Sequence, residues 1–356
     1  MIRMLTLFAL CFFGSVSHAA IVQARTTLLT SLDKNEVWPD SLALSDGLVW
    51  VGHMNTSEQS RNRVQVFDSK TLKLVAETPM PHSPIYLYPF TDTSVLIMGR
   101  TQPPWRTHFS IASLQGWQKG SQVALKTTTF PEEIQADRFT GTAQSLFFTE
   151  PGEASVFQWL NGAVHMLPPV LSGPGEMALL GDTLYVVERR SFDFGDETLT
   201  KISLATGKAE HTFAAPRNGL RSLLAIPEKN WVAVSEMMAN QILLVQESNN
   251  QMVGTLSTPG FPRGITLLHH CLVTVAESKR VYFHHLDRAG FPLVAEWDLS
   301  GAGPSFDVAS SAVADPSTGR LFVRGVNPCA SCPQTRSSVI SAEDPQGTTA
   351  AACNSH

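Results

Sequence analysis

The chain has 356 residues, of which 43% are hydrophobic and 16% charged, and its formal net charge at pH 7 is -5. Charges of both signs are scattered along the sequence without a basic cluster. Nucleic-acid binding requires a basic surface, so this class of function is excluded. The length suits one large β domain or two ordinary domains.

The N-terminal segment 1–19 is typical of a bacterial signal peptide. A positive charge near the start precedes an apolar stretch that is too short to span a bilayer. Small residues just before Ala20 predict cleavage at that point. Cys11 would leave with the peptide, and Leu10 before it disfavours the alternative of a lipoprotein. We expect a periplasmic or secreted protein without a membrane span in the mature chain.

The main sequence signal is an internal repeat. Seven short apolar, β-rich runs each follow a turn signal, and their equivalent positions lie 38 to 50 residues apart. This spacing is close to the length of a four-stranded propeller blade, and helical periodicity is nearly absent. The sequence therefore predicts an all-β fold, a seven-bladed β-propeller. The runs are 48–51, 95–98, 146–149, 184–187, 231–234, 272–275 and 321–323.

Closure of the ring is predicted from the two ends of the chain. The last unit contains three recognisable strands but no clear fourth strand, and an open ring would leave strand edges free to pair with other chains. The N-terminal stretch 21–32 is strand-like and precedes the first full unit. We expect it to supply the outer strand of the seventh blade. The propeller domain is then 20–342, followed by a C-terminal tail, 343–356.

Two segments, RVQVFDSKT at 63–71 and DPSTGRLFV at 315–323, are similar to blades of the YVTN-type repeat propellers. That resemblance implies a propeller with a binding role and no particular reaction. The sequence departs from the family at the end of the second strand of several units, where glutamate stands in place of asparagine.

Four strand-end glutamates are the main candidates for a functional site, because the second strands end on the side from which the innermost strands begin. We expect the glutamates to share this face, here called the upper face, with charged residues that begin the innermost strands. Together these residues would form a mixed charged ring at the mouth of the propeller's central channel, which suits a cation, a basic group or a sugar-like ligand. Alternatively, each carboxylate could cap its own turn. The glutamates are Glu150, Glu188, Glu236 and Glu277, and the neighbouring residues are Glu176, Arg221, Arg263 and Asp307.

The predicted function is binding or scaffolding, with a protein or small-molecule ligand on the upper face. The alternative is a metal-dependent hydrolase of the propeller lactonase type, in which acidic and Asn ligands such as Asn218 or Asn240 hold a divalent metal. No spacing motif singles out a metal site, and no GxSxG elbow indicates a serine hydrolase. We expect no cofactor, and a divalent cation such as calcium is the alternative left open.

Trp105 follows two prolines in a polar loop and is predicted to be an aromatic contact on the upper face. A cation–π pair with a neighbouring arginine is its structural alternative. The adjacent pairs at 269–270 and 284–285 look like metal-ligating histidines, but neighbours on a strand point to opposite faces and cannot chelate together.

The cysteines are predicted to form a structural disulfide near the C-terminus. Cys329 and Cys332 form a CxxC pair in a proline-flanked loop, which favours a disulfide over a redox or haem site. A bond from Cys353 to one of them would hold the tail across the last blade. Cys271 begins a strand and is expected to be a buried, unpaired thiol.

Overall fold

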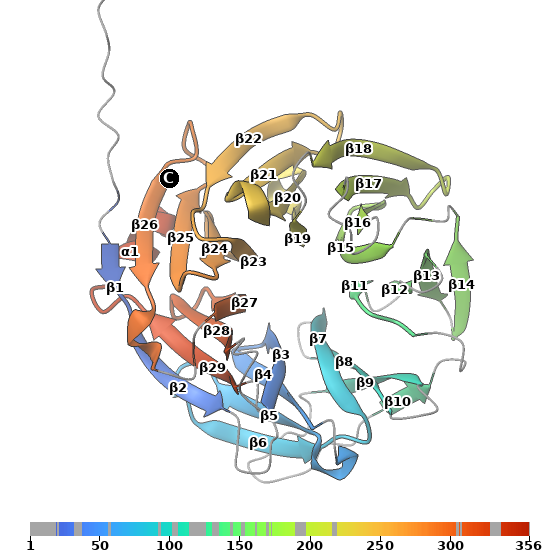
Figure 1. The fold of residues 1–356 in the computed structure, drawn as a ribbon, viewed down its shortest axis with the longest axis horizontal. Coiled ribbons are helices and arrows are strands. Elements are labelled where there is room, and N and C mark those ends of the chain that lie inside the picture. The colour runs from blue at the N-terminus through green and yellow to red at the C-terminus, as the bar shows by residue number, and fades with distance from the viewer. Residues whose placement is uncertain are drawn as a thin grey trace, which may run out of the picture.

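A computed structural model shows seven β-sheets arranged in a closed ring around a central axis (Figure 1). This confirms the predicted seven-bladed propeller. Except for the sixth, which gains a fifth strand, each sheet has four strands. The structure describes residues 19, 21–31, 38–55, 58–91, 94–101, 106–113, 126–129, 135–142, 145–150, 154–160, 162–168, 171, 173–188, 197–215, 219–303, 306, 308–327 and 336–355.

In blades 1 to 6, each strand after the innermost pairs antiparallel with the strand that precedes it in the chain, so the blade begins at the centre of the ring and proceeds outward. The innermost strands are β3 (Trp38–Ser45), β7 (Ser83–Thr91), β11 (Phe139–Gly141), β15 (Pro174–Leu180), β19 (Leu220–Ile226), β23 (Pro262–Leu268) and β27 (Val308–Asp315). The seven runs recognised in the sequence are the second strands: β4 (Leu48–Met54), β8 (Ser94–Arg100), β12 (Ser145–Glu150), β16 (Thr183–Glu188), β20 (Trp231–Glu236), β24 (Cys271–Ala276) and β28 (Arg320–Asn327).

The outer half of each blade consists of a third and a fourth strand. The third strands are β5 (Arg63–Asp68), β9 (Thr107–Ser113), β13 (Ser155–Leu160), β17 (Glu197–Ser203), β21 (Gln241–Gln246), β25 (Arg280–His285) and β29 (Arg336–Glu343). The fourth strands of the first six blades are β6 (Leu74–Pro79), β10 (Lys126–Thr129), β14 (Ala163–Leu167), β18 (Ala209–Ala215), β22 (Met252–Ser257) and β26 (Leu293–Asp298). Short 3-10 turns are η1 (Gln59–Arg61), η2 (Pro227–Lys229), η3 (Met237–Ala239) and η4 (Ser300–Ala302).

The N-terminal segment closes the ring as predicted. Strand β2 (Arg25–Ser31) pairs antiparallel with β29 and becomes the outer strand of the seventh blade. The structure adds a feature that the sequence did not indicate, since the segment is divided at the buried residue Ala24. The first part, β1 (Ile21–Gln23), pairs in parallel with β26 and becomes a fifth strand of the sixth blade. The N-terminal segment therefore joins two blades.

The apolar core lies mainly between the blades, where the faces of neighbouring sheets pack against each other. One cluster joins blades 7 and 1 and includes Val49, Phe67 and Phe322. Another joins blades 4 and 5 and includes Leu180 and Leu199. Burial of these side chains holds each blade against the next, at about 25 cal/mol per Å² of apolar surface removed from water.

The C-terminal tail ends in a short helix, α1 (Thr348–Asn354), which packs on the sixth blade. A disulfide joins Cys353 to Cys271 at the start of β24, 82 positions earlier. The predictions that Cys353 pairs with Cys329 or Cys332 and that Cys271 is unpaired are therefore wrong. The helix contacts β25 and β26 of blade 6, and the backbone amide of His270 donates to the carbonyl of Cys353 at 3.1 Å. Cys329 and Cys332 themselves lie outside the described residues.

No helix in the described part of the chain is long and apolar enough to cross a membrane. The predicted signal peptide lies outside the described residues, apart from Ala19.

Candidate functional site

The upper face carries the loops that leave the second strands and those that enter the innermost strands. The lower face carries the two other turns of each blade. Six of the innermost strands have a β-bulge or similar register irregularity, in each case close to the entry on the upper face. A bulge re-aims the side chains beside it, and it places Glu176, Arg221 and Arg263 around the mouth of the channel.

Three of the strand-end glutamates are buried and bonded inside their own blades. The carboxylate of Glu150 accepts from the backbone amide of Gln135, and that of Glu188 accepts from the hydroxyl of Thr200. The third, Glu236, accepts from the side-chain amide of Gln241 at 2.5 Å. Each carboxylate thus bonds to groups of its own blade, to the entry loop at Glu150 and to the third strand at Glu188 and Glu236.

Glu277 differs from the other three because it lies one position later in the repeat. Strand pairing aligns Pro262 with Ala276, whereas the corresponding strand entries Pro174 and Leu220 pair with the glutamates Glu188 and Glu236. A shift of one residue turns a side chain to the opposite direction. Glu277 is accordingly partly exposed and pairs with Arg263 at the mouth. The expectation that all four glutamates are equivalent is corrected at this position.

Glycine occupies the equivalent position in blades 2 and 7, at Gly99 and Gly325, and the buried His53 occupies it in blade 1. A Cβ at Gly99 would collide with the carbonyl of Ser83, and one at Gly325 would collide with the ring of Phe306. The strand end is therefore a packing position, filled by a hydrogen-bonded carboxylate in blades 3, 4 and 5, by close approach at glycine in blades 2 and 7, and by His53 and Ala276 in blades 1 and 6.

A half-buried arginine that the sequence analysis missed lies on one side of the mouth. Arg138 lies just before β11, and its Nε is 2.5 Å from a carboxylate oxygen of Glu176 in the next blade. Its guanidinium also pairs with Asp137 and lies 5.8 Å from the centre of the Tyr86 ring. Burial opposes the charge on Arg138, but Glu176 and Asp137 more than offset that cost and raise its pKa. Burial and the charge of Glu176 raise the pKa of Tyr86 as well.

A second interaction between blades lies at the start of β19. Arg221 is 3.3 Å from a carboxylate oxygen of Glu197, the first residue of β17. The other oxygen of Glu197 accepts from the backbone amides of Gly219, at 2.5 Å, and of Leu220. Glu197 was also missed, because it begins a third strand, where the repeat gave no reason to expect a site residue.

The mouth opens into a cavity of about 470 Å³ lined by residues of the innermost strands. Its wall mixes the charged residues Asp137, Arg138 and Glu176 with apolar and hydroxyl side chains. Some hydroxyls are engaged, since Ser41 donates to the carbonyl of Pro84 at 2.7 Å. The volume falls within the usual range of small-molecule sites.

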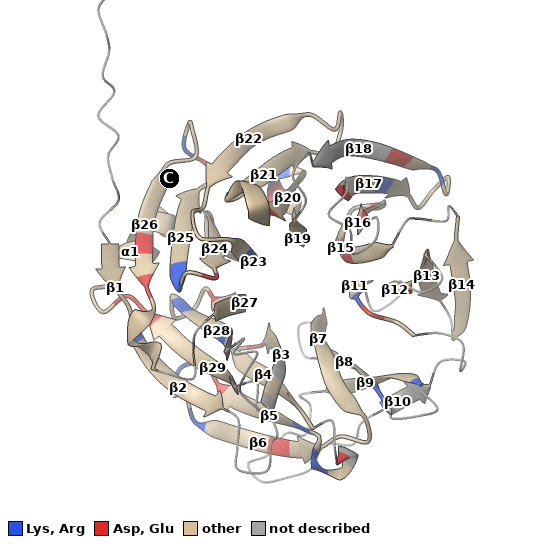
Figure 2. Cartoon of the chain, in the orientation of Figure 1, with Lys and Arg blue, Asp and Glu red and all other residues tan. Residues whose placement is uncertain are grey.

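The other candidates are not part of this cluster. Trp105, Asp307 and Asn218 lie outside the described residues. Asn240 is described and supports a loop, because its side-chain oxygen accepts from two backbone amides of the neighbouring blade's entry loop. In the described part of the chain, no three His, Cys, Asp or Glu side chains are grouped so that they could hold a metal ion. Figure 2 shows acidic and basic residues interspersed around the ring.

No protein-family model matches this chain, and no curated protein matches it in sequence. Among solved structures, the ring is similar to Chaetomium thermophilum Raptor, with a TM-score of 0.63 and 13% identity over 90% of this chain and 30% of that one. It is also similar to the WD40 β-propeller domain of Doa1, with a TM-score of 0.61 and 11% identity over 89% of this chain and 97% of that one. This chain therefore spans less than a third of the Raptor chain. These likenesses establish the propeller fold, and the YVTN-type resemblance stays a prediction.

Proposed function

We propose that this protein is an exported scaffold that binds a protein partner through its upper face. The observation that carries the proposal is that the charged residues described at the mouth are paired with each other across or within blades. Side chains held in this way lose little conformational freedom when a partner binds, which lowers the cost of association.

The buried carboxylates favour this function over the hydrolase alternative. Glu150, Glu188 and Glu236 are each bonded to groups of their own blade, so they do not converge on one position as calcium ligands would. The similarity to two other propellers, at 13% and 11% identity, bears on the fold and adds no particular partner. We propose a protein partner because broad faces framed by loops are suited to protein recognition.

The proposal is tested by photo-crosslinking in the native host, with the full chain and its own N-terminus. A photoreactive amino acid is placed at Ser60 or Gln135 on the upper face, and at Asp46 or Asn249 on the lower face as matched exposed controls. We expect a discrete crosslinked protein from the upper positions only. Crosslinks from the lower positions alone would assign binding to the other face and refute the proposal.

Export is tested on the same preparation. N-terminal sequencing of the protein recovered from the periplasm or the medium is expected to begin at Ala20. Retention of the intact N-terminus in the cytoplasm would refute this part of the proposal.

A further inference from the structure

One residue of the upper face combines two energetic costs. Phe261, in the loop that enters β23, has a φ of 63°, a left-handed conformation that is rare for a bulky side chain. The following residue is Pro262, which restricts its backbone further. The side chain is also 43% exposed, so its apolar surface gains little from folding. Backbone strain of this kind, about 1 to 3 kcal/mol, often marks a functional position.

Phe291 provides an internal comparison. It also has a left-handed backbone, with a φ of 50°. Its ring, however, packs against the indole of Trp231 with 5.7 Å between centroids, and it covers Gly254. Burial of the ring therefore offsets the strain at Phe291. The ring of Phe261 has no aromatic partner among the described residues, so folding provides no comparable compensation there.

The loop that carries Phe261 is held firmly in place. The side-chain oxygen of Asn240 accepts from the backbone amides of Phe261, at 2.9 Å, and of Gly260, at 3.1 Å. The carbonyl of Phe261 accepts from the amide of Glu277 at 3.1 Å. These bonds fix the backbone on both sides of the residue, so the ring is presented to solvent in a defined orientation.

The surroundings have the composition of an interface centre. Met238, 43% exposed, lies in the loop that Asn240 ties to the Phe261 loop. Arg263 lies two residues beyond Phe261, and its side chain is 39% exposed, the largest exposed fraction among the mouth arginines described above. Aromatic residues, methionine and arginine are enriched at the centres of protein interfaces.

Charge at this site indicates the chemistry of the partner. Glu277 binds Arg263 through Nε and Nη2, whereas Nη1 has no partner among the described residues. A protruding ring requires a concave apolar surface, and the remaining guanidinium edge is complementary to a carboxylate.

We propose that Phe261 is the anchor for a folded protein partner at the junction of blades 5 and 6. Its ring enters an apolar pocket of the partner, and an Asp or Glu at the border of that pocket pairs with Arg263. This inference rests on the proposed function, because it specifies the partner and the contact on the same upper face.

The first test asks whether Phe261 serves folding. In Phe261→Asn the new residue tolerates the left-handed backbone, so we expect an unchanged or higher melting temperature. Phe291→Asn, the matched variant, is expected to lower the melting temperature because it removes a packed ring. Equal losses in the two variants would show that Phe261 has a structural role and would overturn the inference.

The second test measures binding. A photoreactive phenylalanine derivative at position 261 is expected to crosslink the same protein as a probe at Ser60 or Gln135. The control is the same probe at Met252, an apolar residue of β22 that is 55% exposed, and we expect no crosslink from it. With that protein purified, Phe261→Asn should weaken binding at least about tenfold and Arg263→Gln by several-fold, with no change for Met252→Asn.

The outcomes separate the two proposals. Crosslinks at Ser60 or Gln135 with full affinity in Phe261→Asn would refute the anchor and leave upper-face binding in place. Crosslinks restricted to the lower face would refute both. A purified partner that contacts position 261 only through charged groups would overturn the apolar pocket.

Discussion

The interface between blades 7 and 1 and the interface between blades 4 and 5 contain different polar contacts. At the lower face of the 4–5 interface, Lys201 reaches the next blade, where it donates to the carbonyl of Glu247 at 2.8 Å and lies 3.2 Å from the carboxylate of the same residue. At the 7–1 interface, Arg320 donates to two carbonyls of the next blade, those of Ser69 at 3.0 Å and Lys70 at 2.5 Å. Arginine's planar fork can hold several acceptors at once, whereas the ammonium of lysine is a point charge.

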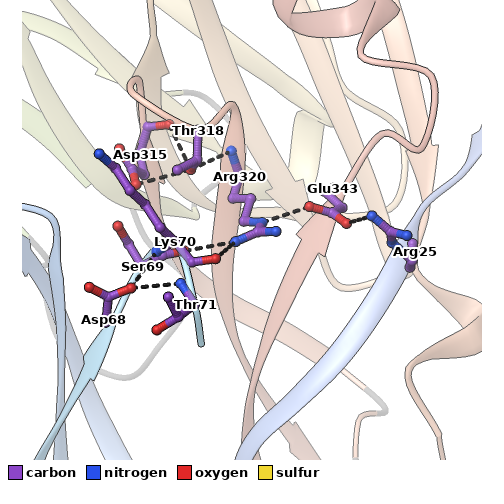
Figure 3. Close-up of polar contacts among 9 residues, drawn as sticks. All are labelled: Arg25, Asp68, Ser69, Lys70, Thr71, Asp315, Thr318, Arg320 and Glu343. Atoms are coloured by element: carbon purple, nitrogen blue, oxygen red, sulfur yellow. Dashed lines mark hydrogen bonds and ion pairs between the residues drawn. The ribbon is translucent and has the colours of Figure 1, made fainter. Parts of the chain in front are cut away.

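The second difference is the origin of the strands. Blade 4 is one continuous segment, whereas blade 7 takes its outer strand from the opposite end of the chain. Arg320 also binds Glu343 of β29 at 2.6 Å, and Glu343 pairs with Arg25 of β2 (Figure 3). At the 7–1 interface, a directed polar contact thus also ties together the separate segments from which blade 7 is assembled. At the 4–5 interface, the polar contacts of Lys201 with Glu247 and of Glu197 with Arg221 join two blades that are each continuous in sequence.

The largest loss of stability is expected from removing the disulfide that holds the C-terminal helix α1 on blade 6. In Cys353→Ser, loss of the disulfide to Cys271 releases a loop of 82 positions, and we expect unfolding to become easier by about 4 kcal/mol. Denaturant titration measures the change, and wild-type protein under reducing conditions should show a similar loss. A loss below about 1 kcal/mol would mean that hydrogen bonds alone hold the helix.

The two interfaces are compared directly by removing one cation from each. Arg320→Met should cost about 2 kcal/mol, because Glu343 and two backbone carbonyls lose a partly buried donor. Lys201→Met, which retains the apolar stem, should cost less than about 1 kcal/mol. Both values come from denaturant midpoints. Equal losses would contradict the assignment of a special role to the 7–1 interface.

The start of α1 provides a pH-dependent test of the same region. Burial opposes ionisation of Asp344, but hydrogen bonds from the Thr349 amide and the Thr348 hydroxyl lower its pKa to about 2. Because the folded pKa lies below the usual 3.8, this stabilisation is complete above pH 3.8 and is lost as the pH falls through 2. Asp344→Asn should cost about 1 kcal/mol at pH 7. The difference from wild type should shrink toward pH 2, and a constant difference would exclude Asp344 as its source.

The smallest effect is expected at the 4–5 interface, at Tyr185. Its hydroxyl is buried without a hydrogen-bond partner in the described part of the chain, and burial raises its pKa. Tyr185→Phe removes an unsatisfied polar group, so we expect stability to be unchanged or higher by up to about 1 kcal/mol. A clear loss in thermal unfolding would reveal a bonded hydroxyl at this interface.

The ring could be predicted from the sequence because each second strand is a short apolar run at a regular interval, as at Leu184 and Leu272. Closure followed from a missing strand at one end and a spare strand at the other. Register could not be predicted to one residue, since nothing in the local pattern distinguishes Glu277 from Glu236, and the pairing of Pro262 with Ala276 decides it.

Contacts between residues of different blades, or between a blade and the C-terminal helix, could not be predicted from the sequence either. Arg138 meets Glu176 only because two entries into the channel lie side by side. Cys271 meets Cys353 only because the last helix packs on the sixth blade, and cysteine spacing does not specify pairing.

The pairing of β2 with β29 also has a consequence for the order of folding. Arg25 and Glu343, which meet in this pairing, are 318 positions apart in the sequence. Contacts of such long range form slowly, because the chain must lose much conformational entropy before they stabilise it. Strand β2, which emerges early in synthesis, must therefore wait for β29, the last strand. We expect a nearly complete ring with one open blade to precede the native state, and its unpaired edge is where aggregation would begin.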